Sequence, residues 1–372
     1  MKKVLLVATV QSHIAQFHKP LIGWLCENGY QVDIAAKNNL ALKPNLRLDI
    51  QGTKFDIPFE RSPFSLRNVK AYLQLKKVIQ NGDYDIVHCN TPVGGILTRL
   101  AANKKRKKGE LKVIYEAHGF HFYKGGPKKN WLLWYPIEKL FAHLTDVLVT
   151  INREDYTLAV EKMKAKRIAY VPGVGLDLSR FENADGNVDL RAEFGLPTCA
   201  KVVISVGELN RNKNQQVIIR ALAHLKDPNI HYFLVGNGPM DGELRQLSKE
   251  LDVAAQVHFL GYRRDVPALL KNADVYAFPS LREGLGMASI EAMASGLPLV
   301  TSDRHGINDY SEDGVTGYKY APKDHCGFAE GIRRIAYDDA LKHQMGEHNK
   351  VVSKSFAVEA AISALASVYR RL

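Results

Sequence analysis

Two acidic residues eight positions apart, Glu283 and Glu291, enclose a Gly-Leu-Gly turn at residues 284–286 and the start of a run of helix formers. Where a loop turns into a helix, backbone N–H groups lack intrahelical partners and the helix dipole favours an anion. A diphosphate could rest on these amides while the two carboxylates bind hydroxyl groups on either side of it. The pattern therefore predicts a nucleotide-sugar site, although glutamates of this spacing are also typical of solvated or capping residues.

Alternating strands and helices are expected to position these residues. In the first half, apolar runs predict strands at residues 4–9, 31–36, 85–89, 111–117 and 146–151. The helices expected between them span residues 17–28, 69–80, 94–103 and 131–143. In the second half, the predicted strands and helices are 202–206, 215–225, 231–235, 242–251, 257–260, 275–278 and 298–301. Apolar strands between helices predict an α/β protein with doubly wound parallel sheets, whose ligands bind beyond the carboxyl ends of the strands.

The length of 372 residues predicts two domains, because a single core rarely grows to that size. A Gly/Pro-rich joint at residues 171–177 places the boundary near residue 182. The expected architecture is two facing Rossmann-like domains, 1–182 and 183–354, with a central cleft. The C-terminal helix, within residues 355–372, is expected to pack back on the first domain.

Composition narrows the classes of function. No apolar run approaches the roughly 20 residues that span a bilayer, and the N-terminal apolar run reads as a first strand rather than a signal peptide. The four cysteines lie far apart and suit reduced thiols in a cytosol. The net charge of +12 is concentrated in residues 1–180, which hold 29 Lys and Arg against 15 Asp and Glu. Such a basic half favours anionic lipid, a phosphate-bearing acceptor or nucleic acid as its partner.

Residues 280–317 resemble the donor-site signature of the family 4 glycosyltransferases, which are retaining enzymes of the GT-B fold. The resemblance is carried by Glu283 and Glu291 as E-x7-E, by the Gly-Leu-Pro at residues 296–298, and by Asp-Gly-Val-Thr-Gly at residues 313–317. It continues at residues 118–119, 171–174, 206–213 and 236–239. Residues 117–123 also resemble the branch that builds bacterial capsular and extracellular polysaccharides on a lipid carrier.

The resemblance implies roles for the matching residues. Glu291 would bind the ribose hydroxyls, since a carboxylate accepts two hydrogen bonds from a diol. Glu283 would contact the donor sugar, and Lys213 would neutralise the leaving diphosphate. His118 would contact the donor sugar near the reacting carbon, with a core or capping histidine as the alternative. The donor would also lie against the backbone amides of Gly284, Leu285, Gly286 and Met287. The first domain would bind the acceptor and the second the donor.

The sequence departs from the family pattern at two loops. Glu208 stands where the family usually has a phosphate-binding Arg, and Arg211 is the expected substitute unless it is a solvated loop residue. The first loop reads Gln-Ser-His-Ile at residues 11–14, where many members have paired glycines. His13 and His18 are therefore candidates to contact an acceptor phosphate, although both also suit surface polar residues.

No metal site is predicted, because the histidines show no ligand spacing and there is no Asp-x-Asp signature. No cofactor is expected beyond the nucleotide sugar, which the resemblance implies is UDP-linked. The expected reaction is metal-independent transfer of a hexose or N-acetylhexosamine to a growing, lipid-linked glycan in capsule or exopolysaccharide synthesis. The leaving diphosphate itself would take the acceptor's proton on the face where the bond breaks.

A basic run at residues 104–108 is typical of a solvated loop, and basic and aromatic residues follow it: Lys124, Lys128, Lys129, Trp131, Trp134 and Tyr135. Together they predict docking of a cytoplasmic enzyme to the anionic inner face of the cell membrane. Three alternatives stay open at this point: a 2-epimerase-like enzyme of the same fold, a nucleic-acid-binding protein, and a two-lobed sugar receptor. Nucleic acid is not the expected partner, since no recognition module is present.

Overall fold

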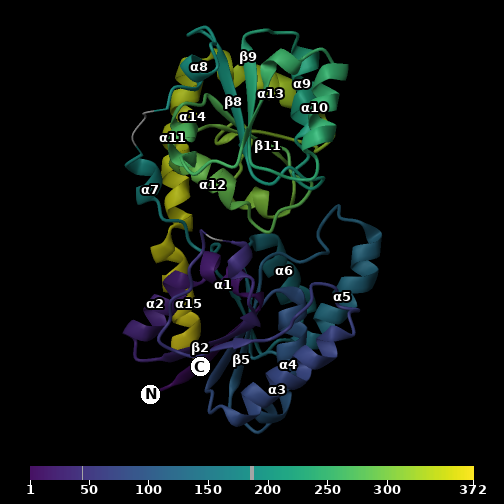
Figure 1. Ribbon diagram of the computed structural model, residues 1–372, viewed down its shortest axis with the longest axis vertical. Coiled ribbons are helices and arrows are strands. Elements are labelled where there is room, and N and C mark those ends of the chain that lie inside the picture. The colour runs from purple at the N-terminus through teal and green to yellow at the C-terminus, as the bar shows by residue number, and fades with distance from the viewer. Residues whose placement is uncertain (44, 185–187) are drawn as a thin grey trace. The chain divides into compact units, whose positions relative to one another are not determined.

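The computed structural model describes residues 1–43, 45–184 and 188–372, which divide into two compact units (Figure 1). Unit 1 comprises Met1–Gly175 and Val358–Leu372, and unit 2 comprises Leu176–Ala357. The division falls after Gly175, within the Gly/Pro-rich joint, whereas the sequence placed the boundary near residue 182. The last helix belongs to unit 1 by its contacts.

Unit 1 is built on one sheet of seven parallel strands in the order β3-β2-β1-β4-β5-β6-β7. Its strands are β1 Lys3–Val10, β2 Gln31–Lys37, β3 Lys54–Asp56, β4 Ile86–Asn90, β5 Lys112–Ala117, β6 Val147–Thr150 and β7 Arg167–Tyr170. Its helices are α1 Gln11–Phe17, α2 Lys19–Glu27, α3 Arg67–Asn81, α4 Pro92–Lys107, α5 Lys128–Ala142, α6 Arg153–Lys162 and α15 Val358–Arg370. The chain reverses direction across the sheet between β1 and β4, so the carboxyl ends of these two strands mark the expected ligand position.

Helices cover both faces of this sheet, which explains why its central strands are largely apolar on both faces. Successive residues of β1, such as Leu5 and Leu6, enter two separate core clusters on opposite faces. In Figure 1, α15 lies beside α2, and Leu365 of α15 joins the cluster that contains Leu6. Helix α15 therefore completes the cover of one face, although it is distant in sequence.

Two predicted elements of unit 1 were wrong in detail. The helix predicted at residues 17–28 is α2, which begins at Lys19, and a separate helix that was not predicted, α1, precedes it directly after β1. The break falls at His18, because Pro20 lacks an N–H and suits only the first turn of a helix. The basic run at residues 104–108 is not a loop either, since Lys104–Lys107 form the last turn of α4.

Unit 2 contains a sheet of six parallel strands in the order β10-β9-β8-β11-β12-β13. Its strands are β8 Lys201–Val206, β9 Ile230–Val235, β10 Val257–Gly261, β11 Val275–Phe278, β12 Leu299–Ser302 and β13 Gly317–Tyr320. Its helices are α7 Ser179–Glu182, α8 Leu190–Glu193, α9 Gln216–Leu225, α10 Asp241–Glu250, α11 Val266–Lys271, α12 Met287–Ala294, α13 His325–Tyr337 and α14 Asp339–Ser353. Its reversal point lies between β8 and β11, at the centre of the sheet.

Both sheets are entirely parallel and doubly wound, as the alternation of strands and helices predicted. Among the helices of the described ranges, none combines the length and apolar character needed to cross a bilayer.

Candidate functional site

A basic and an acidic side chain meet at the reversal point of unit 2. Lys213 follows β8 and Glu283 follows β11, so the two loops leave the carboxyl ends of neighbouring strands. Lys213 Nζ lies 2.8 Å from Glu283 Oε1 and 4.6 Å from the centre of the Phe278 ring. Both charged side chains are largely buried. The pair brings together two of the residues that the sequence predicted would bind the donor.

Helix α12 begins beside this pair, at Met287. Its N-cap is Gly286, which has φ 91° and therefore a left-handed backbone that other residues rarely adopt. A Cβ at Gly286 would lie 2.8 Å from both the Phe278 ring and the Tyr310 hydroxyl. No described side chain caps the helix, so its first-turn amides keep the capacity to bind an anion.

Glu291 lies on the second turn of α12 and is partly buried. Burial raises the pKa of its carboxyl to about 7, and the positive charge of Arg180 opposes this shift. The phenol of Tyr276, on β11, is fully buried, and this burial, with the charges of Glu291 and Glu283, raises its pKa well above the ordinary value. Tyr276 therefore lies among the predicted donor-binding carboxylates. Sequence reasoning missed it, because its place in an apolar strand gives no sign of that position.

Hydrogen bonds in the loop before Lys213 indicate a structural role for Glu208. Glu208 is exposed, and its Oε2 accepts a hydrogen bond from Asn210 Nδ2 at 2.9 Å. Asn210 Oδ1 in turn accepts one from the backbone N–H of Lys213 at 3.0 Å. Glu208 thus helps order the loop that carries Lys213. Arg211 is exposed, and within the described residues no ion pair joins it to Glu283 or Glu291.

A cluster of histidines occupies the corresponding end of the sheet in unit 1. His13 lies on α1, His18 lies between α1 and α2, and His118 directly follows β5. The ring centre of His118 is 4.7 Å from that of His13 and 5.5 Å from that of His18. Sequence spacing predicted no such cluster, because His118 lies on a segment about a hundred residues from the other two. The alternative that His18 is a surface polar residue was wrong, since this side chain is 2% exposed.

A buried carboxylate underlies these rings. Glu116, on β5, lies with Oε1 3.4 Å from His118 Nε2 and with Oε2 3.1 Å from His88 Nε2. Asn90 Oδ1 is 3.2 Å from the same nitrogen of His118, and the Tyr369 hydroxyl of α15 lies 2.8 Å from His88 Nδ1. Sequence reasoning missed the partners of these rings, which are Glu116, His88, Asn90 and Tyr369. For the three that lie in strands, a polar side chain within a buried strand is a usable signal.

The electrostatics of the cluster follow from its burial. Burial lowers the pKa of His18 to about 3, and it also lowers the pKa of His13 and of His118. Burial opposes the charge of Glu116, yet the hydrogen bond with His88 and the neighbouring imidazoles hold the pKa of this carboxyl below its ordinary value. At neutral pH the cluster therefore combines neutral imidazoles with an ionised carboxylate.

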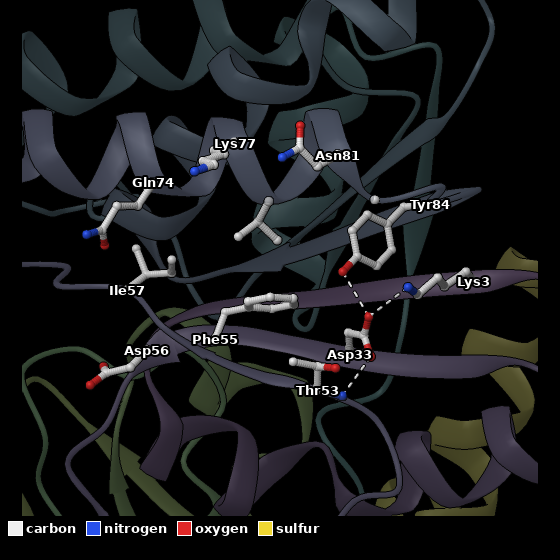
Figure 2. A pocket seen from close by; sticks show the side chains of 12 residues that line it. Lys3, Asp33, Thr53, Phe55, Asp56, Ile57, Gln74, Lys77, Asn81 and Tyr84 are labelled. Carbon is white, nitrogen blue, oxygen red and sulfur yellow. Dashed lines mark hydrogen bonds and ion pairs between the residues drawn. The ribbon is translucent and has the colours of Figure 1, made fainter.

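A cavity of about 510 Å³ also lies in unit 1, at the other end of the strands (Figure 2). The buried carboxylate that lines it already has partners, since Asp33 accepts hydrogen bonds from Tyr84 Oη at 2.9 Å and from the Thr53 N–H at 2.8 Å. Asp33 also pairs with Lys3 Nζ at 3.2 Å. Because Lys3 is the first residue of β1, the cavity is remote from the carboxyl ends where such sheets bind ligands. We therefore assign it no role in the chemistry.

Known proteins resemble this chain along almost all of its length. The model of the Glycosyl transferase 4-like family matches residues 3–152, and that of the Glycosyl transferases group 1 family matches residues 188–352. EpsD of Bacillus subtilis (strain 168), itself a proposed glycosyltransferase, is 38% identical over 99% of this chain and 96% of its own length. The UDP-Gal:alpha-D-GlcNAc-diphosphoundecaprenol alpha-1,3-galactosyltransferase of Escherichia coli is 28% identical over 77% of this chain and 76% of its own length.

Solved structures agree on the fold. Anabaena HepE in complex with UDP and glucose aligns over the whole of both chains with a TM-score of 0.79 at 20% sequence identity. WaaG, a glycosyltransferase involved in lipopolysaccharide biosynthesis, aligns over 98% of this chain and 99% of its own, with a TM-score of 0.74 at 18% identity. These proteins and this chain share the GT-B fold, with its two Rossmann-like domains. With both halves matched and a full-length relative at 38% identity, the chain belongs to the family 4 glycosyltransferases.

Proposed function

We propose that this glycosyltransferase moves a hexose or N-acetylhexosamine from a UDP-sugar to a lipid-linked glycan, with retention of anomeric configuration. The observation that carries the proposal is the Lys213–Glu283 pair beside the start of α12, with Glu291 one turn further along. Support for the nucleotide comes from HepE, whose structure was solved with UDP and with UDP-glucose. Support for the acceptor comes from the Escherichia coli relative, whose name specifies a diphosphoundecaprenol-linked sugar.

The unit 2 site offers a distinct partner to each part of a UDP-sugar. The α12 amides and Lys213 would bind the diphosphate, Glu291 the ribose hydroxyls, and Glu283 the hydroxyls of the sugar. In the reaction, the bond from the anomeric carbon to the diphosphate oxygen breaks and a bond to the acceptor oxygen forms on the same face. The acceptor's proton passes to the departing diphosphate, whose charge Lys213 and the amides stabilise. His118 would contact the sugar near its anomeric carbon, and His13 would contact the acceptor.

We also propose that transfer needs no divalent metal, since Lys213 supplies the positive charge that a metal gives elsewhere. Chelator should leave the rate unchanged. Loss of turnover in chelator that manganese restores would overturn this part of the proposal.

The outer face of α5 supports docking to a membrane that carries the acceptor. Leu132 is 82% exposed, and Leu133 and Leu140 on the same helix are exposed as well. Lys128 and Lys129 open this helix, and exposed Lys139 lies near its end. Trp131 packs inward instead, since its Nε1 donates a hydrogen bond to the Tyr123 carbonyl at 3.1 Å. Leucines flanked by lysines suit a surface of anionic lipid.

The basic run that the sequence grouped with these residues lies elsewhere. Arg106 Nη1 donates to the carbonyl of His143, the residue that follows α5, so the end of α4 lies beside the end of α5. Lys128 and Lys129 stand at the opposite end of this 15-residue helix, roughly 20 Å away. Arg106 is also buried in an ion pair with Asp146 at 2.9 Å. The proposed docking surface is therefore the outer face of α5.

Product analysis with and without acceptor tests the function. Thermal-shift screening of a panel of nucleotide sugars first identifies the donor, and that donor is then incubated with a polyprenyl-diphosphate-linked sugar. We expect product only when the acceptor is present, with the anomeric configuration of the donor retained by NMR. Conversion of the donor alone to another nucleotide sugar would instead indicate a 2-epimerase-like enzyme.

A further inference from the structure

The histidine cluster of unit 1 has the composition of a metal site. One ring nitrogen from each of His13, His18 and His118 lies within 4.8 Å of the other two. Zinc takes imidazole nitrogens at about 2.0–2.1 Å in tetrahedral geometry, which places them roughly 3.4 Å apart. Metal binding would therefore require the rings to move closer together. Three imidazoles with one open position are also the ligand set of several known zinc sites.

Two of these histidines carry a buried ring nitrogen that forms no hydrogen bond within the described residues. Nε2 of His13 and Nε2 of His18 are buried, and neither has a hydrogen-bond partner among the described residues. A buried polar atom without a partner costs free energy, so its persistence points to a ligand.

The third histidine has polar partners behind its ring, as metal ligands usually have. His118 Nε2 faces Glu116 Oε1 at 3.4 Å and Asn90 Oδ1 at 3.2 Å, so it is placed to donate its N–H to them. Its Nδ1 then keeps the lone pair that a metal needs. A carboxylate behind a ligating histidine fixes the ring and raises its basicity.

We propose that His13, His18 and His118 form a binding site for Zn²⁺ or a similar transition-metal cation, oriented by Glu116, and that the bound ion inhibits glycosyl transfer. Inhibition follows because a metal-bound His118 is withdrawn from the donor sugar. The inhibition rests on the proposed function, whereas the binding site does not. The proposal is compatible with turnover that needs no metal, since zinc here acts as an inhibitor.

A second group of ligands must be removed before the site is tested. His224, His325 and Cys326 in unit 2 also have ligand atoms within 4.8 Å of one another, and two of these residues are exposed. The starting protein is therefore the full-length chain carrying His224→Ala and His325→Ala. Cobalt(II) titration then reports a four-coordinate site by its intense visible absorption, and calorimetry with zinc gives the affinity and the stoichiometry.

We expect one equivalent of Co²⁺ or Zn²⁺ to bind to this background protein. His13→Gln, which nearly keeps the side-chain volume, should abolish the visible bands without changing the far-UV dichroism. Glu116→Gln should retain the bands and weaken zinc binding by about 10–100-fold. No binding to the background protein, or equal binding with and without His13→Gln, would overturn the site.

Activity assays test whether metal at this site inhibits transfer, separately from the test of metal binding. Zinc should inhibit transfer by the background protein, with a midpoint that matches the calorimetric affinity, and chelator should restore the rate. The His13→Gln variant should resist zinc at the same concentration, whatever its own basal rate. Stoichiometric binding without inhibition would keep the metal site and contradict the donor contact proposed for His118.

Discussion

At the scale of single residues, the proposed contact of Glu291 with the ribose would make nucleotide binding depend on pH. A carboxylate accepts hydrogen bonds from a ribose diol, whereas its protonated form accepts them less well. Because burial raises the pKa of Glu291 to about 7, the ionised fraction rises about tenfold between roughly pH 6 and pH 8. We expect UDP affinity, measured by calorimetry, to rise more steeply with pH in the wild type than in Glu291→Gln. The phosphate of UDP titrates in the same range, so equal slopes in the two proteins would contradict the role of Glu291.

The same residue links folding to pH. The folded-state pKa of Glu291 is above its unfolded value, so between the ordinary value near 4.3 and about 7 the folded chain binds more protons than the unfolded chain. The free energy of unfolding contributed by Glu291 therefore falls as pH rises through this window. Urea denaturation at about pH 5 and at about pH 7.5 should show a smaller loss in Glu291→Gln than in the wild type. A larger loss in the variant would contradict the direction of the shift.

Substitutions of the two glutamates in the proposed donor site should change different quantities, turnover for Glu283 and UDP affinity for Glu291. Glu283→Ala removes a sugar contact and the partner of Lys213, so turnover should fall by about 100-fold while UDP affinity is nearly kept. Glu291→Ala should mainly weaken UDP binding, because the contact proposed for Glu291 is to the ribose. Steady-state kinetics and UDP calorimetry on both variants check this division. Equal loss of UDP affinity in both variants would show it to be wrong.

At the scale of elements, sequence patterns predicted the long, buried strands well and the short edges poorly. Both sheet centres, β1 and β8, were predicted because unbroken apolar runs need cover on both faces. The edge strand β3 was missed because it has three residues and only Phe55 is partly buried. Helix α1 was missed because the apolar pattern of residues 11–17 is weak and no side chain caps its start.

The candidate site also contains residues that local sequence patterns predicted and contacts that they could not predict. Lys213, Glu283 and Glu291 were predicted because each lies in a local motif that a single sequence displays. The Lys213–Glu283 contact depends on the pairing of β8 with β11, which follows from topology and not from any local pattern. Glu116 and His88 were missed for the same reason, since their pairing needs the register of β4 against β5.

Helices α4 and α5 are joined by a buried ion pair that makes a stability prediction. Arg99 Nη2 lies 3.0 Å from Glu138 Oε2, and Tyr115 Oη donates a hydrogen bond to Glu138 Oε1 at 3.0 Å. Glu138→Ala leaves the guanidinium of Arg99 buried without its partner, at a cost of about 3–5 kcal/mol in the free energy of unfolding. Chemical denaturation measures this loss.

An exposed pair provides the control for that experiment. Glu330 and Arg334 form an i,i+4 pair on the surface of α13, so Glu330→Ala should change the free energy of unfolding by less than about 1 kcal/mol. Similar losses in the two variants would show that the Arg99–Glu138 pair does not stabilise the fold as its burial indicates.

At the scale of the whole molecule, the uneven charge points to a surface rather than to a pocket. Residues 1–180 carry the positive excess, and the donor residues lie outside them in unit 2. Part of that charge is used inside the fold, as in the buried Arg106–Asp146 pair. The exposed lysines of α5 remain, beside leucines that no described residue covers. The proposed docking to a membrane that carries the acceptor would use both the charge and the apolar side chains of this face.

Vesicle flotation tests this surface with variants matched in charge. Lys128→Ser with Lys129→Ser should weaken binding to anionic vesicles by about 2 kcal/mol, or roughly 30-fold, because each lysine near such a surface contributes about 1 kcal/mol. Leu132→Ser with Leu133→Ser should weaken binding at high salt as well, where electrostatic attraction is screened. Lys104→Ser with Lys107→Ser removes the same charge at the far end of α5 and should change binding less. If this control pair lost as much affinity as the Lys128 and Lys129 pair, diffuse charge rather than the face of α5 would hold the protein at the membrane.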